Sequence, residues 1–279
     1  MPRTDTGWII TPEELRGWIL EETADWLAVN KPAGVVCHPS KHGPWSSLVG
    51  AAREYLREPV LHMPSRLDRE TSGIVVLVRR RETGSRMQRA IQAGRVRKRY
   101  LAILEGLLRE PRLVDLPIGR AAASAVFLKQ AVREDGQPAR TRFTPLDWRG
   151  GKTLARVEPE TGRLHQIRVH AAAIGNPVAG DKLYGSDETL FLEFIRHGYT
   201  ERLRQRLGAE RQMLHAEELV FDFGEQVIRF HAPLAEDMAR FWASLAAQGR
   251  QAEAQKPMST PPSTGNTTPL TNRAAGEQR

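Results

Sequence analysis

The sequence predicts an α+β fold built on a mixed, largely antiparallel sheet. Three features indicate this class: many short apolar runs typical of strands, helical segments that are well separated, and no steady alternation of strand and helix. A doubly wound parallel sheet would require that alternation. Of the 279 residues, 40% are hydrophobic, which is enough for a sizeable core.

In the first sixty residues, clear secondary-structure signals begin only after residue 16. Residues 1–16 form a segment whose only signal is Thr11–Leu15, a pattern typical of the first turn of a helix. The apolar run 26–30 predicts a short strand, because a proline and a glycine follow it closely. A pair of serines then precedes a helix expected over 48–56, where apolar residues recur at helical spacing.

A continuous apolar run over 74–78, mostly β-branched, predicts a buried strand. A helix is expected over 82–93, ended by Gly94 in the left-handed conformation. The run 95–99 carries four cations and leads directly into a strand expected over 100–104. A basic segment at this place favours contact with a phosphate backbone. The alternative is a solvated sheet edge that discourages association with other sheets.

The following residues are expected to add strands, loops and helices to one folded domain over 17–248. Loops and short strands are predicted over 106–139, followed by two strands over 141–146 and 153–157 around a Gly-Gly turn. A largely helical stretch is predicted over 187–212, with Leu190, Phe191, Phe194 and Ile195 as its apolar face. A hairpin of 219–223 with 227–230 then precedes a helix over 236–246, with Met238, Phe241, Trp242 and Leu245 facing inward. Prolines and threonines then dominate, which predicts a disordered tail over 249–279.

The charge balance indicates a polyanionic partner. The chain has 41 Lys and Arg against 33 Asp and Glu, a net charge of +8, and only seven of its cations are lysines. The planar guanidinium of arginine suits phosphates and stacked bases, so this balance favours nucleic acid. The alternative is that a GC-rich coding sequence produces the same excess of arginine.

The cysteine count and the apolar runs exclude several classes of protein. The single cysteine, Cys37, excludes an intrachain disulfide and a metal cluster built from cysteines. No run reaches the ~18 apolar residues of a membrane span, and the first residues lack the layout of a signal peptide. We therefore expect no membrane association and a cytoplasmic location.

The polar loop Ser65–Gly73, just before the apolar strand, has the composition of a catalytic site. Asp68 lies in it between Arg66 and Arg69. An opposite charge at hydrogen-bond distance lowers the pKa of an acid, so this loop favours an ionised carboxylate, a candidate nucleophile or base. The alternative is an aspartate that caps a turn while the two arginines lie in solvent.

The pattern Arg66-Leu67-Asp68-x-x-Thr71-Ser72-Gly73 resembles the active-site motif of the RluA-type pseudouridine synthases. The resemblance covers residues 19–245, and further motifs follow in the order of that family: Asn30–Gly34, Lys98–Ala102, Gly162–His170, Asp181–Gly185 and Leu214–Ala216. It implies the pseudouridine synthase fold. Part of the family carries a small N-terminal RNA-binding module, and we expect none here because the residues before the first motif leave no room for it.

The resemblance also implies a reaction. Such an enzyme breaks the N1–C1′ bond of a uridine in RNA, turns the uracil and rejoins it through C5. The family needs no cofactor and no metal, so we expect neither here. The implied partner is ribosomal or transfer RNA, and the implied oligomeric state is a monomer.

By resemblance, Asp68 is the catalytic carboxylate, Tyr100 offers a ring on which uracil stacks, and Arg168 keeps Asp68 ionised. Stacking is worth ~1–3 kcal/mol per base. An ion pair at ~4 Å and an effective dielectric of about 20 attracts by ~4 kcal/mol before the desolvation cost. The alternatives are Arg66 or Arg163 as the partner of Asp68, and a Tyr100 that simply faces the core.

Six side chains are expected to bind RNA: Arg66, Arg69, Arg97, Lys98, Arg163 and His165. By resemblance, Arg66 enters the RNA stack beside the flipped nucleotide and offsets part of the roughly few kcal/mol that flipping costs. His165 and His170 lie about 140° apart around a helix, so they do not form the i, i+4 pair of a zinc helix. We expect positioning or phosphate contact for His165 and burial in the core for His170.

Ser65 departs from the family, whose members commonly carry histidine before the motif arginine. Because the rest of the motif is present, we expect activity, with substrate choice affected. One alternative is a catalytically inactive RNA-binding or RNA-folding protein of the same fold. Another is a metal-dependent phosphoesterase that uses Asp68 and the histidines.

Overall fold

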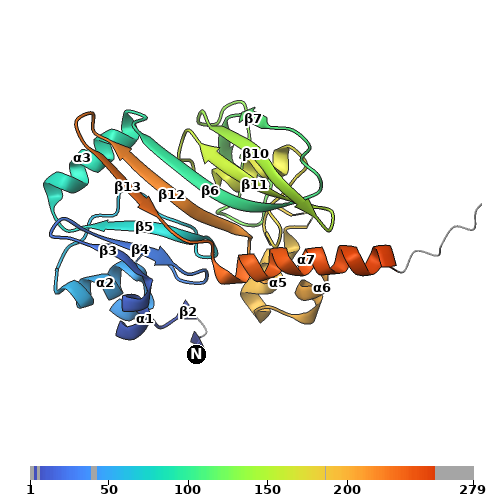
Figure 1. Cartoon of the computed structure of the whole chain (residues 1–279), viewed down its shortest axis with the longest axis horizontal. Helices are drawn as coiled ribbons and strands as arrows, with labels where there is room; N and C mark the ends of the chain where they lie inside the picture. The colour runs from blue at the N-terminus through green and yellow to red at the C-terminus, as the bar shows by residue number, and fades with distance from the viewer. Residues whose placement is uncertain (1–2, 5–6, 39–42, 186, 255–279) are drawn as a thin grey trace, which may run out of the picture.

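In the computed structural model, which describes residues 3–4, 7–38, 43–185 and 187–254, the chain folds around a nine-stranded sheet (Figure 1). Its strands are β3 (Ile19–Glu22), β4 (Trp26–Lys31), β5 (Ser72–Val78), β6 (Val96–Glu105), β7 (Arg112–Asp115), β10 (Arg140–Arg149), β11 (Lys152–Pro159), β12 (Leu214–Asp222) and β13 (Val227–His231). Their order is β3-β4-β5-β12-β6-β11-β10-β7, with β13 paired to β12. Within this sheet only β5 and β12 pair in parallel, which confirms the predicted α+β class with a mixed, largely antiparallel sheet.

Helices cover both faces of the sheet. The structure describes α1 (Pro12–Trp18), α2 (Leu48–Leu56), α3 (Arg81–Gln92), α4 (Gln166–Ala173), α5 (Thr189–His197), α6 (Glu201–Leu207) and α7 (Glu236–Ala254), with the 3-10 turn η1 (Pro44–Ser46) and two small ribbons, β1 (Arg3–Thr4) with β2 (Gly7–Trp8) and β8 (Ile118–Arg120) with β9 (Gln130–Val132). In the first half of the sheet, α1 and α2 lie on one side and α3 on the other (Figure 1). In the second half, α4 and α7 pack on opposite faces. None of the described helices is both long and apolar enough to cross a membrane.

Side-chain alternation along β5 explains why both of its faces are covered. All seven of its residues are buried. Val75 packs with α1 and α2, whereas Ile74 and Val76 pack with α3 and β12. A strand buried on both faces has a continuous apolar run in place of an alternating one, as the sequence has here.

The two halves of the sheet meet where β5 and β12 run side by side. The parallel pairing is short and joins Ser72 with His215 and Gly73 with Ala216. Gly73 has a φ of 111°, and a Cβ added to it would lie 2.2 Å from the carbonyl oxygen of Ala216. Only glycine therefore allows this conformation and this approach of the two strands.

Local sequence sets the helix starts close to their expected places. Thr11 and Glu14 form a capping box at α1, with the Glu14 N–H donating to Oγ1 of Thr11 over 3.1 Å. Ser47 caps α2 by accepting from the N–H of Gly50 over 3.2 Å. Leu15 of α1 packs in the same core as Leu27, so the core includes residues before the expected domain start at 17.

Three details differ from the expectations. Strand β6 begins at Val96, four residues before the expected start at 100. The basic residues 97–99 are therefore part of the strand and do not form a loop before it. Helix α7 continues to Ala254, beyond its expected end at 246 and past the expected start of the tail; the predicted tail residues 255–279 lie outside the described part of the chain. Ile195 is 63% exposed, so it does not belong to the apolar face of α5.

Candidate active site

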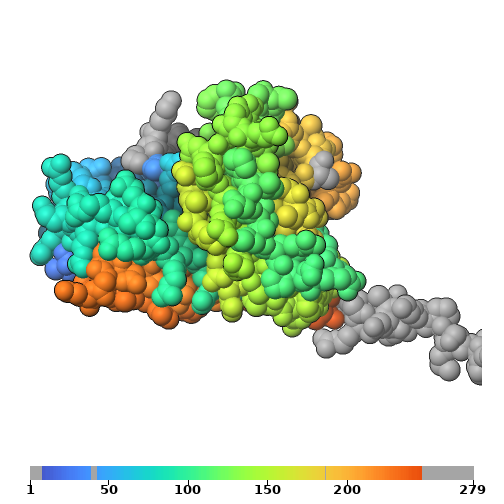
Figure 2. Space-filling view, turned by 90° about the horizontal axis from the view of Figure 1, so that it is seen from above, coloured from blue at the N-terminus to red at the C-terminus, as the bar shows by residue number. Residues whose placement is uncertain are grey.

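A cleft with a volume of about 760 Å³ opens beside the junction of the two sheet halves. Its lining comes from the loop 63–71, the C-terminal end of α3, two residues of β6 and the segment 159–168. Figure 2 shows the teal surface that includes α3 beside the yellow-green surface that includes β11. The loop that carries Asp68 therefore opens into a cavity formed by both halves of the sheet.

Asp68 is held by the turn that leads into β5. The N–H of Thr71 donates to the carbonyl of Asp68 over 3.1 Å. Beneath the turn, the fully buried ammonium of Lys31 donates to the carbonyl of Arg69 over 3.1 Å and to two further carbonyls. Burial lowers the pKa of Lys31 to about 8. Lys31, at the end of β4, thus ties the loop after β4 to the turn that carries Asp68.

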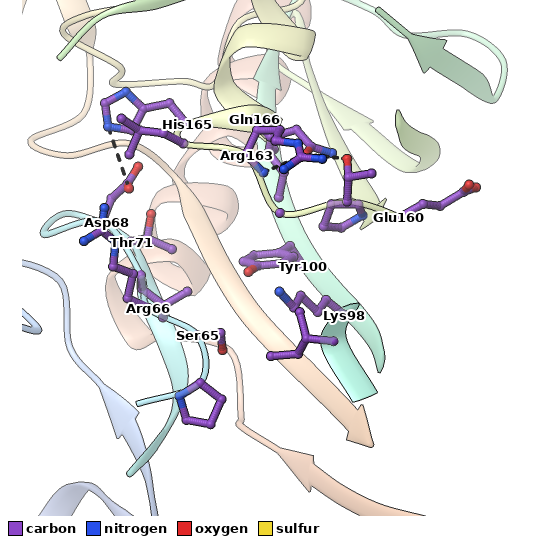
Figure 3. Close-up of a pocket in the computed structure, with 18 of the residues that line it drawn as sticks. Ser65, Arg66, Asp68, Thr71, Lys98, Tyr100, Glu160, Arg163, His165 and Gln166 are labelled. Carbon is purple, nitrogen blue, oxygen red and sulfur yellow. Dashed lines mark hydrogen bonds and ion pairs between the residues drawn. The ribbon is translucent and has the colours of Figure 1, made fainter. Parts of the chain in front are cut away.

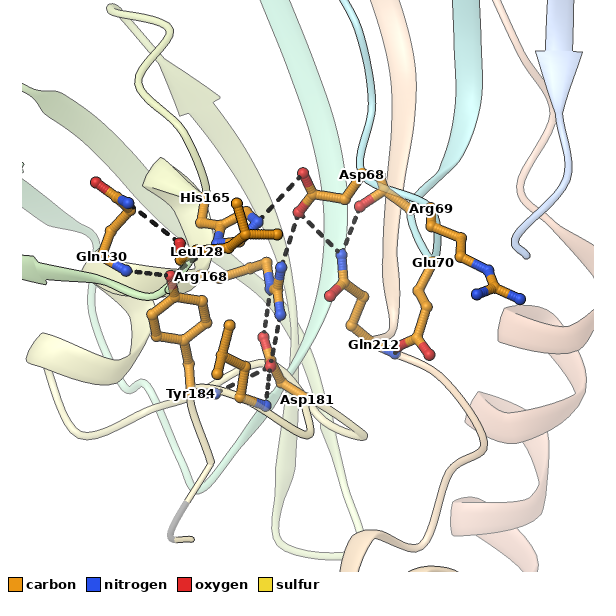
Figure 4. A network of polar contacts seen from close by, with 12 residues as sticks. Asp68, Arg69, Glu70, Leu128, Gln130, His165, Arg168, Asp181, Tyr184 and Gln212 are labelled. Atoms are coloured by element: carbon orange, nitrogen blue, oxygen red, sulfur yellow. Dashed lines mark hydrogen bonds and ion pairs between the residues drawn. The ribbon is translucent and has the colours of Figure 1, made fainter. Parts of the chain in front are cut away.

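Arg168 joins two carboxylates in a line. Its Nη1 lies 2.9 Å from Oδ2 of Asp68. Its Nε and Nη2 bind both oxygens of Asp181, over 2.6 and 2.9 Å, in a bidentate pair (Figure 4). The ion pair predicted between Asp68 and Arg168 is present, and the buried Asp181 orients the guanidinium that makes it.

The charges of Asp68, Arg168 and Asp181 determine the protonation state of Asp68. Burial alone would raise the pKa of Asp68, but the Arg168 guanidinium outweighs it and holds that pKa below its usual range. Burial likewise opposes the charge of Arg168, and the two carboxylates raise its pKa in spite of it. Asp68 is therefore ionised at neutral pH while 26% of its side chain remains exposed to the cleft.

His165 lies on the other side of the Asp68 carboxylate. Its Nε2 is 3.8 Å from Oδ1 of Asp68, and its Nδ1 is 2.7 Å from the Tyr184 hydroxyl. That hydroxyl also accepts from the backbone N–H of Gln130 over 2.9 Å. Because the ionised Asp68 can only accept, the imidazole proton belongs on Nε2, facing Asp68, and Nδ1 then accepts from the Tyr184 hydroxyl. Burial and the neighbouring Arg168 lower the pKa of His165 to about 4. At neutral pH the ring is therefore a neutral polar neighbour of Asp68 and not a cation.

The segment before α4 presents this histidine at a sharp bend. His165 has a φ of 56°, a left-handed conformation that is uncommon for a residue with a Cβ. The buried Gln166 stabilises the bend, because its side-chain oxygen accepts from the hydroxyl of Thr161 over 2.7 Å and from the N–H of Arg163 over 3.0 Å. A strained backbone held by several hydrogen bonds is typical of a functional loop.

Gln212 completes the surroundings of Asp68 from the start of β12. Its side-chain Nε2 lies 2.6 Å from Oγ1 of Thr71 and 3.4 Å from Oδ2 of Asp68 (Figure 4). Asp68 therefore has three side chains around it: His165 and Arg168 from the start of α4, and Gln212 from the residues next to β12. Side chains this far apart in sequence are brought together by the β5–β12 junction.

Tyr100 and Lys98 form the wall of the cleft on β6. They are two residues apart on one strand, so their side chains lie on the same face, about 6.6 Å apart along the backbone. Burial, with a contribution from Asp68, raises the pKa of Tyr100, so its hydroxyl keeps its proton. In Figure 3 this hydroxyl points toward the side of the cleft that carries Asp68 and Thr71.

Comparison with known proteins decides the family. The family model for RNA pseudouridylate synthase matches residues 25–173, more than half of the chain and including Asp68, Tyr100, His165 and Arg168. The chain belongs to the RNA pseudouridylate synthase family. It is accordingly an enzyme that isomerises uridine in RNA to pseudouridine.

Individual proteins agree with this family. The synthase is 35% identical over 243 residues to ribosomal large subunit pseudouridine synthase D of Xanthomonas campestris, a match that covers 84% of this chain and 71% of that protein. It is 32% identical over 258 residues to the protein of the same description from Yersinia pestis, covering 87% and 74%. Among solved structures, human RNA pseudouridylate synthase domain containing 1 superposes with a TM-score of 0.64 and 25% identity, covering 86% of this chain and 95% of that one.

Four of the six residues predicted to bind RNA line the cleft of the synthase: Arg66, Lys98, Arg163 and His165. Arg66 and Arg163 are exposed at its mouth. Arg66 contacts the ring nitrogen of His38, and Nε of Arg163 donates to the carbonyl of Pro138 over 3.0 Å. His165 lies beside Asp68, as described above.

Arg69 and Arg97 do not line the cleft. Nε of Arg69 donates to the carbonyl of Gly34 over 3.2 Å, on the side of the loop away from Asp68. Arg97 alternates with Lys98 and Tyr100 along β6 and so projects from the opposite face of the sheet. RNA contact by these two arginines stays a prediction, and the cleft does not account for it.

Sequence reasoning missed three residues of this network: Asp181, which binds Arg168, Tyr184, which contacts His165, and Gln212, which contacts Asp68. Asp181 and Tyr184 lie in a motif shared with the family, but their spacing says nothing about which cation or histidine they contact. Gln212 has no sequence signal beyond its place before Leu214. Only the fold reveals these contacts.

The remaining candidate residues are structural. The buried His170 contacts the hydroxyl of Thr141 over 2.8 Å and the carbonyl of Leu116 over 2.9 Å, as expected for a core histidine. Cys37 is buried, with its thiol 3.4 Å from the carbonyl of Leu67. Across the described ranges, no three His, Cys, Asp or Glu side chains are grouped so as to hold a metal ion.

Proposed function

We propose that the synthase modifies one or more uridines of ribosomal RNA, with Asp68 as the catalytic carboxylate, Tyr100 as the stacking platform and Arg168 as the residue that positions and charges Asp68. The observation that carries this proposal is the Asp68–Arg168 pair at 2.9 Å, inside a cleft large enough for a flipped nucleotide. Relatives described as ribosomal large subunit synthases favour ribosomal over transfer RNA.

The reaction requires one bond to break and one to form. The N1–C1′ bond of uridine breaks, the uracil turns within the cleft, and C5 bonds to C1′; C5 then loses its proton and N1 gains one. No group enters or leaves overall. An ionised Asp68 serves each of three routes to this outcome: attack on C1′, addition to the uracil ring, or removal of a ribose proton.

Arg168 suits its proposed role because hydrogen bonds already fix the position of its guanidinium. Asp181 takes two of its donors and Asp68 takes a third, so the guanidinium holds the carboxylate at a fixed place. A preorganised charge costs no reorganisation during the reaction. His165 and Gln212 supply neutral polar contacts on the same carboxylate.

Tyr100 suits the stacking role because it lies in the cleft wall and keeps its proton at neutral pH. A protonated phenol is a poor base but a good hydrogen-bond donor, and its ring offers a flat surface to uracil. The hydroxyl therefore assists as a hydrogen-bond donor to the uracil while it turns, and the proton that C5 loses goes to another acceptor. Around this platform, Arg66, Lys98 and Arg163 contact RNA phosphates or bases, and His165 orients Asp68.

A monomer is proposed as the active unit, because Asp68, Tyr100 and Arg168 lie in the same cleft of a single chain. Action on ribosomal RNA in turn favours the cytoplasm as the site of action. The inactive RNA-binding alternative gains no support, since the motif residues Asp68, Thr71 and Arg168 are present and in contact with one another or with Gln212.

Tritium release tests this function. Purified protein is incubated with large-subunit ribosomal RNA transcribed with C5-tritiated uridine, and in parallel with transfer RNA of the same label. Release of tritium to water from the ribosomal RNA alone is the expected result. Binding of both RNAs without release would support the inactive alternative, and release from transfer RNA alone would overturn the proposed substrate.

A further inference from the structure

The cleft continues beyond the catalytic residues toward α3. Asp68 and His165 lie at one end, and Ser65 and Lys98 lie at the other, past Tyr100 (Figure 3). This second end is also lined by residues of α3 and the turn after it: Gln88, Ile91, Gln92 and Gly94. A uracil stacked on Tyr100 and acted on by Asp68 leaves this end of the cleft without a part in the isomerisation.

Gln88 and Gln92 present two amide groups to this end of the cleft. They lie four residues apart on α3, so their side chains are neighbours on one face of the helix. Both are exposed, and among the described residues no hydrogen bond engages either amide. Each amide offers two N–H donors and one carbonyl acceptor, a set that matches the N6 and N7 edge of adenine.

The same end of the cleft offers an apolar surface and a cation. Ile91 lies between the two glutamines in sequence and lines the cleft with them. The ammonium of Lys98 has no carboxylate within 4 Å in the part of the chain that the structure describes. Burial lowers its pKa, a cost that a bound phosphate would offset. The cleft wall therefore holds a lysine whose charge the described residues do not neutralise.

We propose that this end of the cleft, the α3 subsite (Gln88, Ile91, Gln92 and Lys98), binds the nucleotide next to the target uridine. Gln88 and Gln92 read its base, for which adenine is the preferred partner, and Lys98 binds its phosphate. Lys98 is adjacent to Tyr100 on the face of β6 that holds the target base, so a neighbouring nucleotide reaches it without a change in direction. This inference rests on the proposed function, because it assumes that the target uracil occupies the site at Tyr100.

The test uses a library of RNA hairpins, each with one uridine in its loop and randomised bases on both sides. The library is incubated with wild-type protein, and the modified members are identified by sequencing after chemical marking of pseudouridine. In parallel, the members that bind are recovered and sequenced, so that preference is read from binding as well as from turnover. The variant Gln88→Ala/Gln92→Ala keeps good helix formers at exposed positions, so α3 retains its fold.

Wild-type protein is expected to prefer adenine at one flanking position by roughly tenfold, and the double alanine variant is expected to lose that preference. Gln92→Glu, which replaces a donor and acceptor by acceptors alone, is expected to shift the preference toward cytosine. Lys98→Ala is expected to weaken binding to all members alike, because phosphate contacts carry no sequence information.

Gln226→Ala is the matched control, since Gln226 is an exposed glutamine outside the cleft and contacts Arg86 over 3.2 Å. Its preference profile should equal that of wild type. An active wild type whose profile is unchanged by the double alanine variant overturns the α3 subsite alone. RNA binding without turnover contradicts the proposed function, but the sequences that bind still test the α3 subsite. The absence of both binding and turnover overturns the proposed function and the α3 subsite together.

Discussion

At the scale of single residues, the site depends on how the N–H donors of Arg168 are shared between Asp68 and Asp181. Three of its nitrogens contact two carboxylates, and only a planar fork reaches both at once. The ring of Tyr184 lies below the guanidinium, 4.8 Å from it, and adds a further constraint on its orientation. Asp68 is therefore positioned by a network of side chains whose mutual contacts cannot be predicted from the sequence.

Arg168→Lys should lower kcat by about 100-fold with little change in KM. An ammonium keeps the charge but cannot bind Asp181 in a bidentate manner and reach Asp68, and a misplacement of ~1 Å costs about that much in rate. Single-turnover kinetics on a labelled RNA measure it. Arg163→Lys, in the cleft but not in contact with Asp68, is the control and should affect KM more than kcat. An unchanged kcat in Arg168→Lys would show that the bidentate pair has no positioning role.

The pH dependence of the single-turnover rate follows from the same contacts. In the proposed mechanism Asp68 acts in its ionised form, and its pKa is held below the usual range, so the rate should be lost only when the pH falls through that lowered pKa. His165, with a pKa of about 4, also does not titrate near neutrality. We expect a rate that is flat from about pH 5 to about pH 7. An inflection near pH 6 would mean that His165 titrates and acts as an acid or base.

At the scale of elements, the junction of β5 and β12 places Asp68 opposite Gln212. The sequence predicts the position of β5 well, because its apolar run is long and a glycine precedes it. It predicts β6 less well, since basic residues along a strand resemble a loop until the pairing with β12 is known. The junction itself joins residues more than a hundred positions apart, which no local pattern reveals.

Gly73→Ala tests this junction. A Cβ at Gly73 meets the backbone of Ala216 at 2.2 Å, and its φ of 111° is strained for alanine, so the free energy of unfolding should fall by at least about 2 kcal/mol. Urea unfolding measures the change. Gly175→Ala is the matched control, because Gly175 also has a positive φ but open space around it. Equal losses in the two variants would contradict a role for the close contact.

At the scale of the whole molecule, two sheet halves with separate cores enclose one basic cleft. The net charge of +8 indicates an RNA partner from sequence alone, but not which arginines face it. The structure brings Arg66, Lys98 and Arg163 to the cleft and leaves Arg69 and Arg97 outside it, because strand alternation and loop direction decide the side on which each lies. The proposed catalytic residues are predictable from motifs; their partners and the shape of the cleft come only from the fold.

The salt dependence of RNA binding distinguishes these arginines. Each phosphate contact in a single strand contributes about 0.7 to the slope of log affinity against log salt concentration. Arg66→Ala should reduce the magnitude of the slope by about that amount if its partner is a phosphate, and Arg97→Ala should leave it unchanged unless RNA also contacts the face of the sheet opposite the cleft. Titration of one labelled RNA at several salt concentrations measures both. A reduced slope for Arg97→Ala would show that RNA also contacts the opposite face of the sheet.

The proposed mechanism assigns the isomerisation to one ionised aspartate, Asp68, held in place by Arg168. The most direct test compares Asp68→Asn with wild type, measuring RNA affinity and single-turnover release of tritium from C5-labelled RNA. The amide keeps the shape of the side chain and removes its charge, so we expect RNA affinity to stay within a few-fold while release falls to background. Release at a rate near that of wild type would contradict the claim.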